Sequence, residues 1–112
     1  MSVKPKSLVV YQSANGKQPY TDWFRSLKDK QTQAIILKRL NRLRQGNLGD
    51  YKSLKDGLFE LRIDYGPGYR IYFAQEADQL VILLLCAGQK SSQENDIKAA
   101  RKYLMDYRSH HE

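Results

Sequence analysis

The stretch from Leu58 to Lys90 constrains the fold of this 112-residue chain more than any other segment. Within it, two segments of alternating apolar and polar residues flank the sequence Gly66-Pro67-Gly68, and an unbroken apolar run, Leu80 to Ala87, follows. Alternation with a period of two is typical of half-buried strands, and a short glycine-containing connection between two such segments indicates a hairpin. We therefore predict an antiparallel hairpin followed by a central strand whose two faces are covered at least in part.

The predicted hairpin brings two arginines together. A turn centred on Gly66 that keeps the apolar side chains on one face places Arg62 directly opposite Arg70 on the other face. Like charges opposite each other in a sheet are mildly destabilising, so the pair needs either acidic neighbours or a negatively charged ligand. Glu60 and Asp64 share this face and satisfy the first requirement, which makes an ordinary solvated face with ion pairs one interpretation.

Two lysines near the arginine pair favour the other interpretation, an anion-binding site. Lys55 lies just upstream of the hairpin, and Lys90 lies at the end of the third predicted strand. Planar guanidinium groups bind pairs of phosphate oxygens, and a cluster of cationic side chains is what phosphodiester binding or cleavage requires.

Three motifs in this order resemble the RelE/ParE toxin superfamily, and most closely its HigB-like "addiction module killer protein" branch. They are L-K-D-G-L-F-E-L-R-I, G-P-G-Y-R-I-Y-F and L-L-L-C-A-G-Q-K-S-S-Q-E-N-D-I-K-A-A. The similarity runs from about Tyr11 to about Leu104, and the ordered combination is far more specific than any one motif. It implies a small bacterial toxin that a cognate antitoxin protein neutralises. Many relatives cut messenger RNA in the ribosomal A site, and others inhibit DNA gyrase.

The resemblance also implies a cluster of basic catalytic side chains on the sheet, and the matching positions are Arg62, Arg70 and Lys90. Two positions depart from the pattern of the family. Asp96 stands where some relatives carry a tyrosine in the last helix, and Glu60 stands where a lysine is expected. We therefore predict Arg62, Arg70, Lys90 and Asp96 as catalytic residues and leave the identity of the general base open.

Three further residues are predicted to contact RNA. The loop from Asn47 to Asp56 directs Lys52 and Lys55 toward the hairpin. Gln93 lies with Asp96 at the start of the last helix, where positioning of RNA, proton transfer and plain helix capping are all open interpretations.

Composition limits the range of partners and compartments. Lys and Arg number 19 against 12 acidic residues, and the net charge of +7 suits a nucleic acid, the ribosome or an acidic protein. The single cysteine, Cys86, lies in the apolar run and is most simply a buried side chain in a reducing compartment. No N-terminal apolar segment has the length of a secretion signal, so we expect a cytoplasmic protein. We expect neither a metal nor a cofactor.

Helical stripes and one further strand complete the predicted core. A strand is expected around Leu8 to Tyr11, a helix from Pro19, a second helix from its cap Asp29 to about Gln45, and a third near the C-terminus. The inward-facing residues are Tyr20, Trp23, Phe24 and Leu27 in the first helix, Ile36, Leu37, Leu40 and Leu43 in the second, and Ile97, Ala100, Leu104 and Tyr107 in the third. Lys38, Arg39, Arg42 and Arg44 lie outside the second stripe, and contact with ribosomal RNA or antitoxin and an ordinary solvated face are both open interpretations.

Together these features predict one domain, residues 1–112, of the α+β class with a RelE-like fold. Its order is β-α-α-β-β-β-α, with a largely antiparallel sheet, two N-terminal helices on one face and the last helix near the other. The predicted function is that of a toxin of a type II toxin–antitoxin pair, a metal-independent, ribosome-dependent messenger RNA endonuclease. The alternatives are a non-enzymatic inhibitor of DNA gyrase and a regulatory protein without toxicity.

Overall fold

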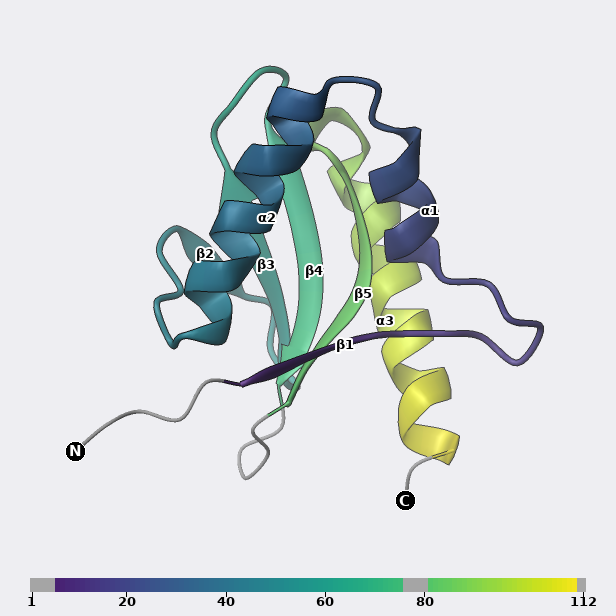
Figure 1. Ribbon diagram of the computed structural model, residues 1–112. Helices are drawn as coiled ribbons and strands as arrows, with labels where there is room; N and C mark the ends of the chain where they lie inside the picture. Colours follow the sequence, from purple (N-terminus) through teal and green to yellow (C-terminus); the bar gives the residue numbers. More distant parts are fainter. Residues whose placement is uncertain (1–5, 76–80, 111–112) are drawn as a thin grey trace.

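The structure is a computed structural model that describes residues 6–75 and 81–110 (Figure 1). Its elements are β1 (Ser7–Val10), α1 (Pro19–Ser26), α2 (Lys30–Arg44), β2 (Tyr51–Ser53), β3 (Leu58–Ile63), β4 (Tyr69–Gln75), β5 (Val81–Gln89), the 3-10 turn η1 (Lys90–Ser92) and α3 (Gln93–His110). The predicted α+β class is confirmed, and the predicted order holds broadly, with one strand more than expected. One short strand, β2, lies inside the segment that was expected to be a loop.

The five strands form one sheet in the order β1-β5-β4-β3-β2. Strand β1 pairs with β5 in parallel, and the other neighbours are antiparallel. Strand β5 therefore has a partner on each side, which confirms that the apolar run forms a central strand. Leu80, the expected first residue of that strand, lies outside the described residues. Strand β2 escaped prediction because all three of its residues are exposed and show no apolar alternation.

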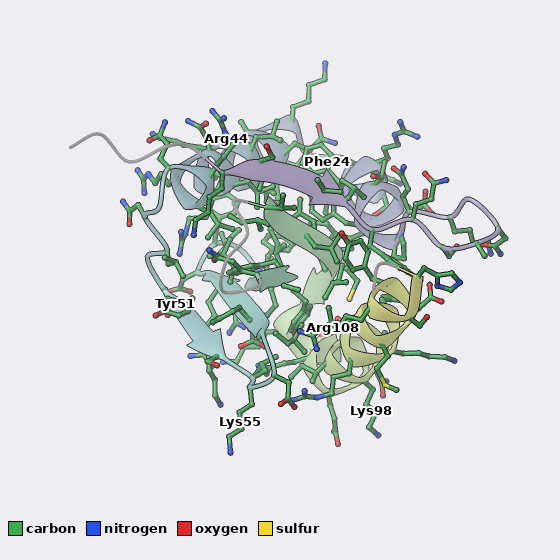
Figure 2. The ribbon with its side chains drawn as sticks, turned by 90° about the horizontal axis from the view of Figure 1, so that it is seen from below. Phe24, Arg44, Tyr51, Lys55, Lys98 and Arg108 are labelled. Atoms are coloured by element: carbon green, nitrogen blue, oxygen red, sulfur yellow. The ribbon has the colours of Figure 1, made fainter. Side chains whose placement is uncertain are left out.

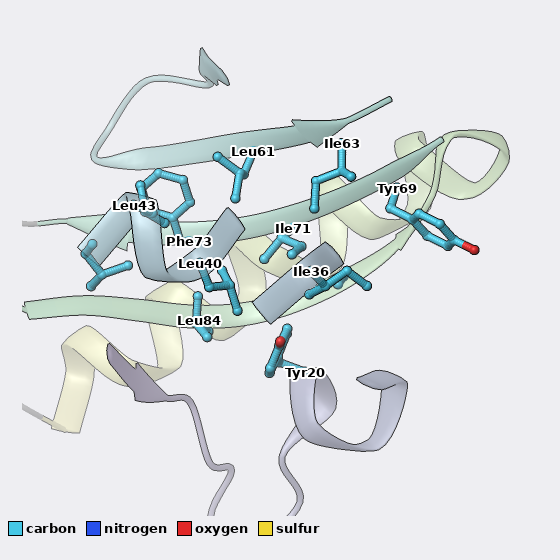
Figure 3. Close-up of a cluster of buried hydrophobic side chains, with 12 residues drawn as sticks. Tyr20, Ile36, Leu40, Leu43, Leu61, Ile63, Tyr69, Ile71, Phe73 and Leu84 are labelled. Atoms are coloured by element: carbon cyan, nitrogen blue, oxygen red, sulfur yellow. The ribbon is translucent and has the colours of Figure 1, made fainter. Parts of the chain in front are cut away.

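The sheet carries a hydrophobic core on each face. Helices α1 and α2 cover one core, which Figure 3 shows in close-up, and α3 covers the other. The buried residues of the first core are Tyr20, Ile36, Leu40, Leu43, Leu61, Ile63, Tyr69, Ile71, Phe73, Ile82, Leu84 and Ala87. Those of the second are Tyr11, Leu58, Tyr72, Ala74, Leu83, Leu85, Cys86, Ala100 and Leu104.

The helical stripes agree with prediction except at one position. In α1, Tyr20 is buried and Trp23 and Phe24 pack against the first core. In α2, the side chain of Asp29 caps the helix by accepting a hydrogen bond from the Gln31 N–H, as predicted. Leu37 was expected to face inward but is 54% exposed, because the face of α2 that meets the sheet is turned toward Ile35, which packs against the first core.

Leu84 provides a test of the central position of β5. This side chain is 2% exposed, so Leu84→Ala is expected to lower the free energy of unfolding by roughly 2–5 kcal/mol through lost burial and a residual cavity. Urea denaturation measures the change. Leu37→Ala makes the same truncation at an exposed site, where a change within about 0.5 kcal/mol is expected. An equally small change for Leu84→Ala would contradict a buried central strand.

Candidate functional site

An open groove of about 440 Å³ lies beside the turn that joins β3 to β4. Its lining residues are Asp50, Arg62, Asp64, Gly66, Pro67, Gly68, Arg70 and Lys90. The register of the hairpin is as predicted, with Arg62 directly opposite Arg70. Three of the four residues predicted to be catalytic therefore meet at one surface depression.

Backbone pairing brings the third cation to the arginines. In the β4–β5 ladder Arg70 pairs with Gly88, so the end of β5 lies next to the end of the hairpin. The backbone N–H of Lys90 then donates to the carbonyl oxygen of Gly68 at 2.8 Å. This bond fixes the backbone of Lys90 against the turn, while its side chain is exposed.

A buried carboxylate, Glu60, lies beneath the arginine pair. Its side chain is fully buried, and Arg62 Nε donates to its Oε1 at 3.0 Å. Its Oε2 accepts from the Tyr72 hydroxyl at 3.1 Å and from Gln93 Nε2 at 2.7 Å. Arg70 Nε lies 4.0 Å from Oε1. Strands β3 and β4 and helix α3 thus converge on one negative charge.

Arg70 is more enclosed than its position on the outward side of β4 predicts. Only 12% of its side chain is exposed, against 34% for Arg62. Its Nη1 donates to the carbonyl oxygen of Tyr69 at 3.0 Å, and its Nε is buried without a hydrogen-bond partner among the described groups. Buried donors are nearly always paired in folded proteins, so an unpaired one on a guanidinium at a groove marks a site of functional interest.

The surroundings of Glu60 keep it ionised. Burial raises the pKa of this carboxyl, but hydrogen bonds from Gln93, Arg62 and Tyr72 outweigh burial, and its pKa is lowered overall. The pKa of the Tyr72 phenol is raised by burial and then by the charge of Glu60. Tyr72 is therefore a hydrogen-bond donor at neutral pH, and Glu60 is a fixed negative charge rather than a proton acceptor.

Asp96 lies next to the groove, not among its lining residues. Its carboxylate accepts a hydrogen bond from the Ser92 hydroxyl and presses against Gly88 so closely that a Cβ there would have no room. The backbone carbonyl of Asp96 accepts from Cys86 Sγ at 3.6 Å. These contacts hold the first turn of α3 against β5, and Gln93, which reaches Glu60, belongs to that turn.

Cys86 is buried, as predicted. Burial is the main cause that raises the pKa of its thiol to about 12. A thiol with this pKa is not a nucleophile at neutral pH.

The two lysines predicted to bind RNA differ in their distance from the groove. Lys52 is exposed on β2 as the register partner of Glu60, two residues from Asp50 at the groove. Lys55 lies in the turn between β2 and β3, where it points into solvent (Figure 2). That turn is at the opposite end of the six-residue strand β3, roughly 17 Å along the strand from the groove. The structure does not bring Lys55 into the site.

Two properties of the described residues concern metal binding and the crossing of a membrane. No group of three or more His, Cys, Asp or Glu side chains within them is arranged to hold a metal ion. Of the two adjacent histidines near the C-terminus, His110 belongs to the described residues and His111 does not. None of the described helices combines the length and the apolar character needed to cross a membrane.

The chain thus forms an α+β domain in which three cationic side chains line a groove at the end of a hairpin. Residues 22–105 match the family described as "Phage derived protein Gp49-like (DUF891)", and the chain belongs to this family. The family is toxin-like and related to addiction module toxins, which implies an antitoxin partner. An uncharacterized protein of Haemophilus influenzae is 50% identical over 82 residues, which cover 73% of this chain and 82% of that relative.

Proposed function

We propose that the protein is the toxin of a type II toxin–antitoxin pair and that it cuts messenger RNA on the ribosome without a metal ion. The resemblance to RelE/ParE toxins, and to their HigB-like branch, supports this function. The observation that carries it is the convergence of Arg62, Arg70 and Lys90 on one groove. An inhibitor that binds gyrase by surface complementarity does not need three cations along one groove.

The proposed reaction is attack of a ribose 2′-oxygen on the adjacent phosphorus. The new bond to phosphorus forms as the bond to the 5′-oxygen breaks, which leaves a 2′,3′-cyclic phosphate and a 5′-hydroxyl. Negative charge builds up on the non-bridging oxygens, where Arg62 and Arg70 would stabilise it. Lys90 would donate a proton to the leaving 5′-oxygen or bind phosphate.

Glu60 has the role of a positioning residue in this proposal. It contacts Arg62 directly and lies 4.0 Å from Arg70 Nε, so it limits the directions in which the two guanidinium groups can point. Preorganised donors contribute to catalysis because they do not have to reorient as the charge develops. Gln93 reaches the same carboxylate from α3, so its first role is to complete this buried contact, and RNA contact by Gln93 stays a prediction.

The general base would be one of the carboxylates near the arginines. Asp50 and Asp64 are both exposed and line the groove, which puts them within reach of a bound ribose. The carboxylate of Asp96 is engaged with Ser92 and packs against Gly88, so a catalytic role for Asp96 would require it to leave these partners. That role stays a prediction.

The partner proposed for this toxin in the cytoplasm is a cognate antitoxin that supplies carboxylates or covers the groove. The net charge of +7 favours such a partner and its rapid association.

Mapping of transcript 5′ ends after induction in cells tests the proposed activity. Attack by the 2′-oxygen leaves 5′-hydroxyl products, so the new ends are expected to carry a 5′-hydroxyl. Because the proposed enzyme acts on the ribosome, these ends are expected inside translated frames and only when the transcripts carry ribosomes. Uninduced cells and a transcript without a start codon are the controls. Intact transcripts accompanied by a DNA-damage response would instead identify a gyrase inhibitor.

A further inference from the structure

Helix α2 carries an unbalanced positive charge. Its 15 residues include five Lys or Arg and no Asp or Glu. Three of these are Lys38, Arg39 and Arg42. Arg42 is four residues from Lys38 and three from Arg39, so the three side chains lie within about 100° on one side of the helix. We call them the α2 cation cluster. Lys38 and Arg42 are exposed, and Arg39 is half-buried.

No side chain of the α2 cation cluster forms an ion pair within the part of the chain that the structure describes. The ion pairs of Arg62 and Arg70 with Glu60 and of His110 with Asp106 all lie outside α2. Burial and then the charge of Arg42 lower the pKa of Arg39, and the charge of Asp50 opposes both effects. Like charges four residues apart destabilise a helix, and a solvated helix face ordinarily relieves this with interleaved carboxylates.

The cluster adjoins the groove. Arg39 Nη2 donates to the carbonyl oxygen of Asp50 at 3.1 Å, and Asp50 lines the groove. Gly49, with φ of +62°, allows this contact, because a Cβ there would lie 2.5 Å from Arg39 Nη2. The Asp50 carbonyl also accepts from the backbone N–H of Arg62 at 2.9 Å. One backbone carbonyl therefore connects the α2 cation cluster to the strand that carries Arg62.

We propose that the α2 cation cluster binds the phosphate backbone of RNA that continues past the groove. This inference rests on the proposed function, since RNA has to occupy the groove first. An RNA strand that leaves the groove at Asp50 would meet Arg39 and, beyond it, Arg42 and Lys38. The contact would add affinity without reading sequence, because phosphate contacts position a nucleic acid and base contacts specify it.

The residues around the cluster favour RNA over a protein partner. Asn41, three residues from Lys38, and Gln45, the C-cap residue three residues from Arg42, are exposed and polar. The large exposed apolar residue of this helix, Leu37, lies about 100° around the helix from Lys38 and further from Arg42. Protein interfaces depend on buried aromatic or aliphatic anchors, whereas phosphate contacts depend on cations and polar groups.

Salt-dependent RNA binding tests the inference. The probe is a fluorescein-labelled RNA hairpin with a single-stranded 3′ extension, and anisotropy gives Kd over a series of salt concentrations. Each lost phosphate contact lowers the slope of log K against log salt by about 0.7–0.9. Arg42→Ala is expected to lower the slope by about this amount, and Lys38→Ala with Arg42→Ala by about twice as much. Both sites are exposed, and alanine favours a helix, so the variants are expected to stay folded.

Lys98→Ala is the matched control. It removes one exposed positive charge from α3, and Figure 2 shows Lys98 on the opposite side of the protein from the α2 residue Arg44. Its slope is expected to equal that of the wild type. Equal losses in Lys98→Ala and Arg42→Ala, or no loss in Arg42→Ala, would overturn the inference. So would an oligoglutamate of matched charge that binds the wild type more tightly than RNA and loses affinity in Arg42→Ala, since that result identifies an acidic protein as the partner.

The binding assay and the cleavage assay test the RNA-binding surface and the nuclease activity separately. If the wild type binds RNA through the α2 cation cluster but produces no 5′-hydroxyl ends in cells, the nuclease proposal fails and the RNA-binding surface stands. If cleavage in cells is retained while the cluster variants bind RNA like the wild type, the surface is wrong and the nuclease stands.

Discussion

Arg70→Ala is expected to abolish toxicity while the protein stays folded. Arg70 lines the groove opposite Arg62, and Glu60 keeps its hydrogen bonds to Arg62, Tyr72 and Gln93 when Arg70 is truncated. Removal of a donor that acts mainly in the transition state costs about 2–4 kcal/mol of barrier, which corresponds to roughly 30- to 1,000-fold in rate. The measurements are growth after induction and the yield of new 5′-hydroxyl ends.

Two further variants separate chemistry from charge and folding. Arg70→Lys keeps the charge but loses the planar fork, so only partial rescue is expected. Arg25→Ala removes one positive charge from the exposed surface of α1 and is expected to remain fully toxic. Urea denaturation of Arg70→Ala should stay within about 1 kcal/mol of the wild type, since its ion pair with Glu60 is long. A folded and fully toxic Arg70→Ala protein would mean that the groove is not the catalytic site.

The arginine pair was predictable because a hairpin has few possible registers. A one-residue slip would turn the apolar side chains of β3 to the other face, so the apolar pattern and the glycine turn together determine which residues are opposite. The same reasoning identified β5 as central, since a strand with one solvated face does not show a continuous apolar run. Local patterns thus decided the hairpin, the central strand and most helical stripes.

The burial of Glu60 was not predictable from local patterns. Alternation places it correctly on the face of Arg62, but the acidic and basic residues of that face predict a solvated surface with ion pairs. It is buried because Gln93, 33 residues later, and Tyr72 on the next strand close over it. The signal available was an acidic residue opposite a tyrosine in the predicted register, and only the path of α3 shows that water is excluded there.

The positions of Lys55 and Leu37 were also not predictable from local sequence patterns. Proximity in sequence suggested that Lys55 accompanies the hairpin to the groove, yet β2 turns the chain so that Lys55 lies at the far end of β3. Leu37 fits a helical stripe but is exposed, because the way α2 lies on the sheet decides which of its residues are buried. Both positions depend on packing between elements, which periodicity within one element does not encode, and RNA contact by Lys55 stays a prediction.

Glu60→Ala is expected to lower the free energy of unfolding by about 3–5 kcal/mol and to reduce toxicity as well. The truncation removes a buried charge on which Arg62, Tyr72 and Gln93 depend, and it leaves the Tyr72 hydroxyl buried without its acceptor. It also frees the two groove arginines to reorient. Urea denaturation at neutral pH measures the stability, and 5′-end mapping measures the activity.

The pH dependence of this loss distinguishes a buried charge from lost volume. Folding lowers the pKa of Glu60, so its contribution is fully present above the unfolded pKa of about 4.3 and is lost as the pH falls through the folded pKa. Glu60→Gln, which keeps the size of the side chain, should therefore be much less stable than the wild type at pH 7. The two proteins should converge only at an acidic pH below the lowered folded pKa, where the wild-type carboxyl binds its proton. If the gap between wild type and Glu60→Gln is the same at both pH values, the ionised carboxylate is not what holds Arg62, Tyr72 and Gln93 together.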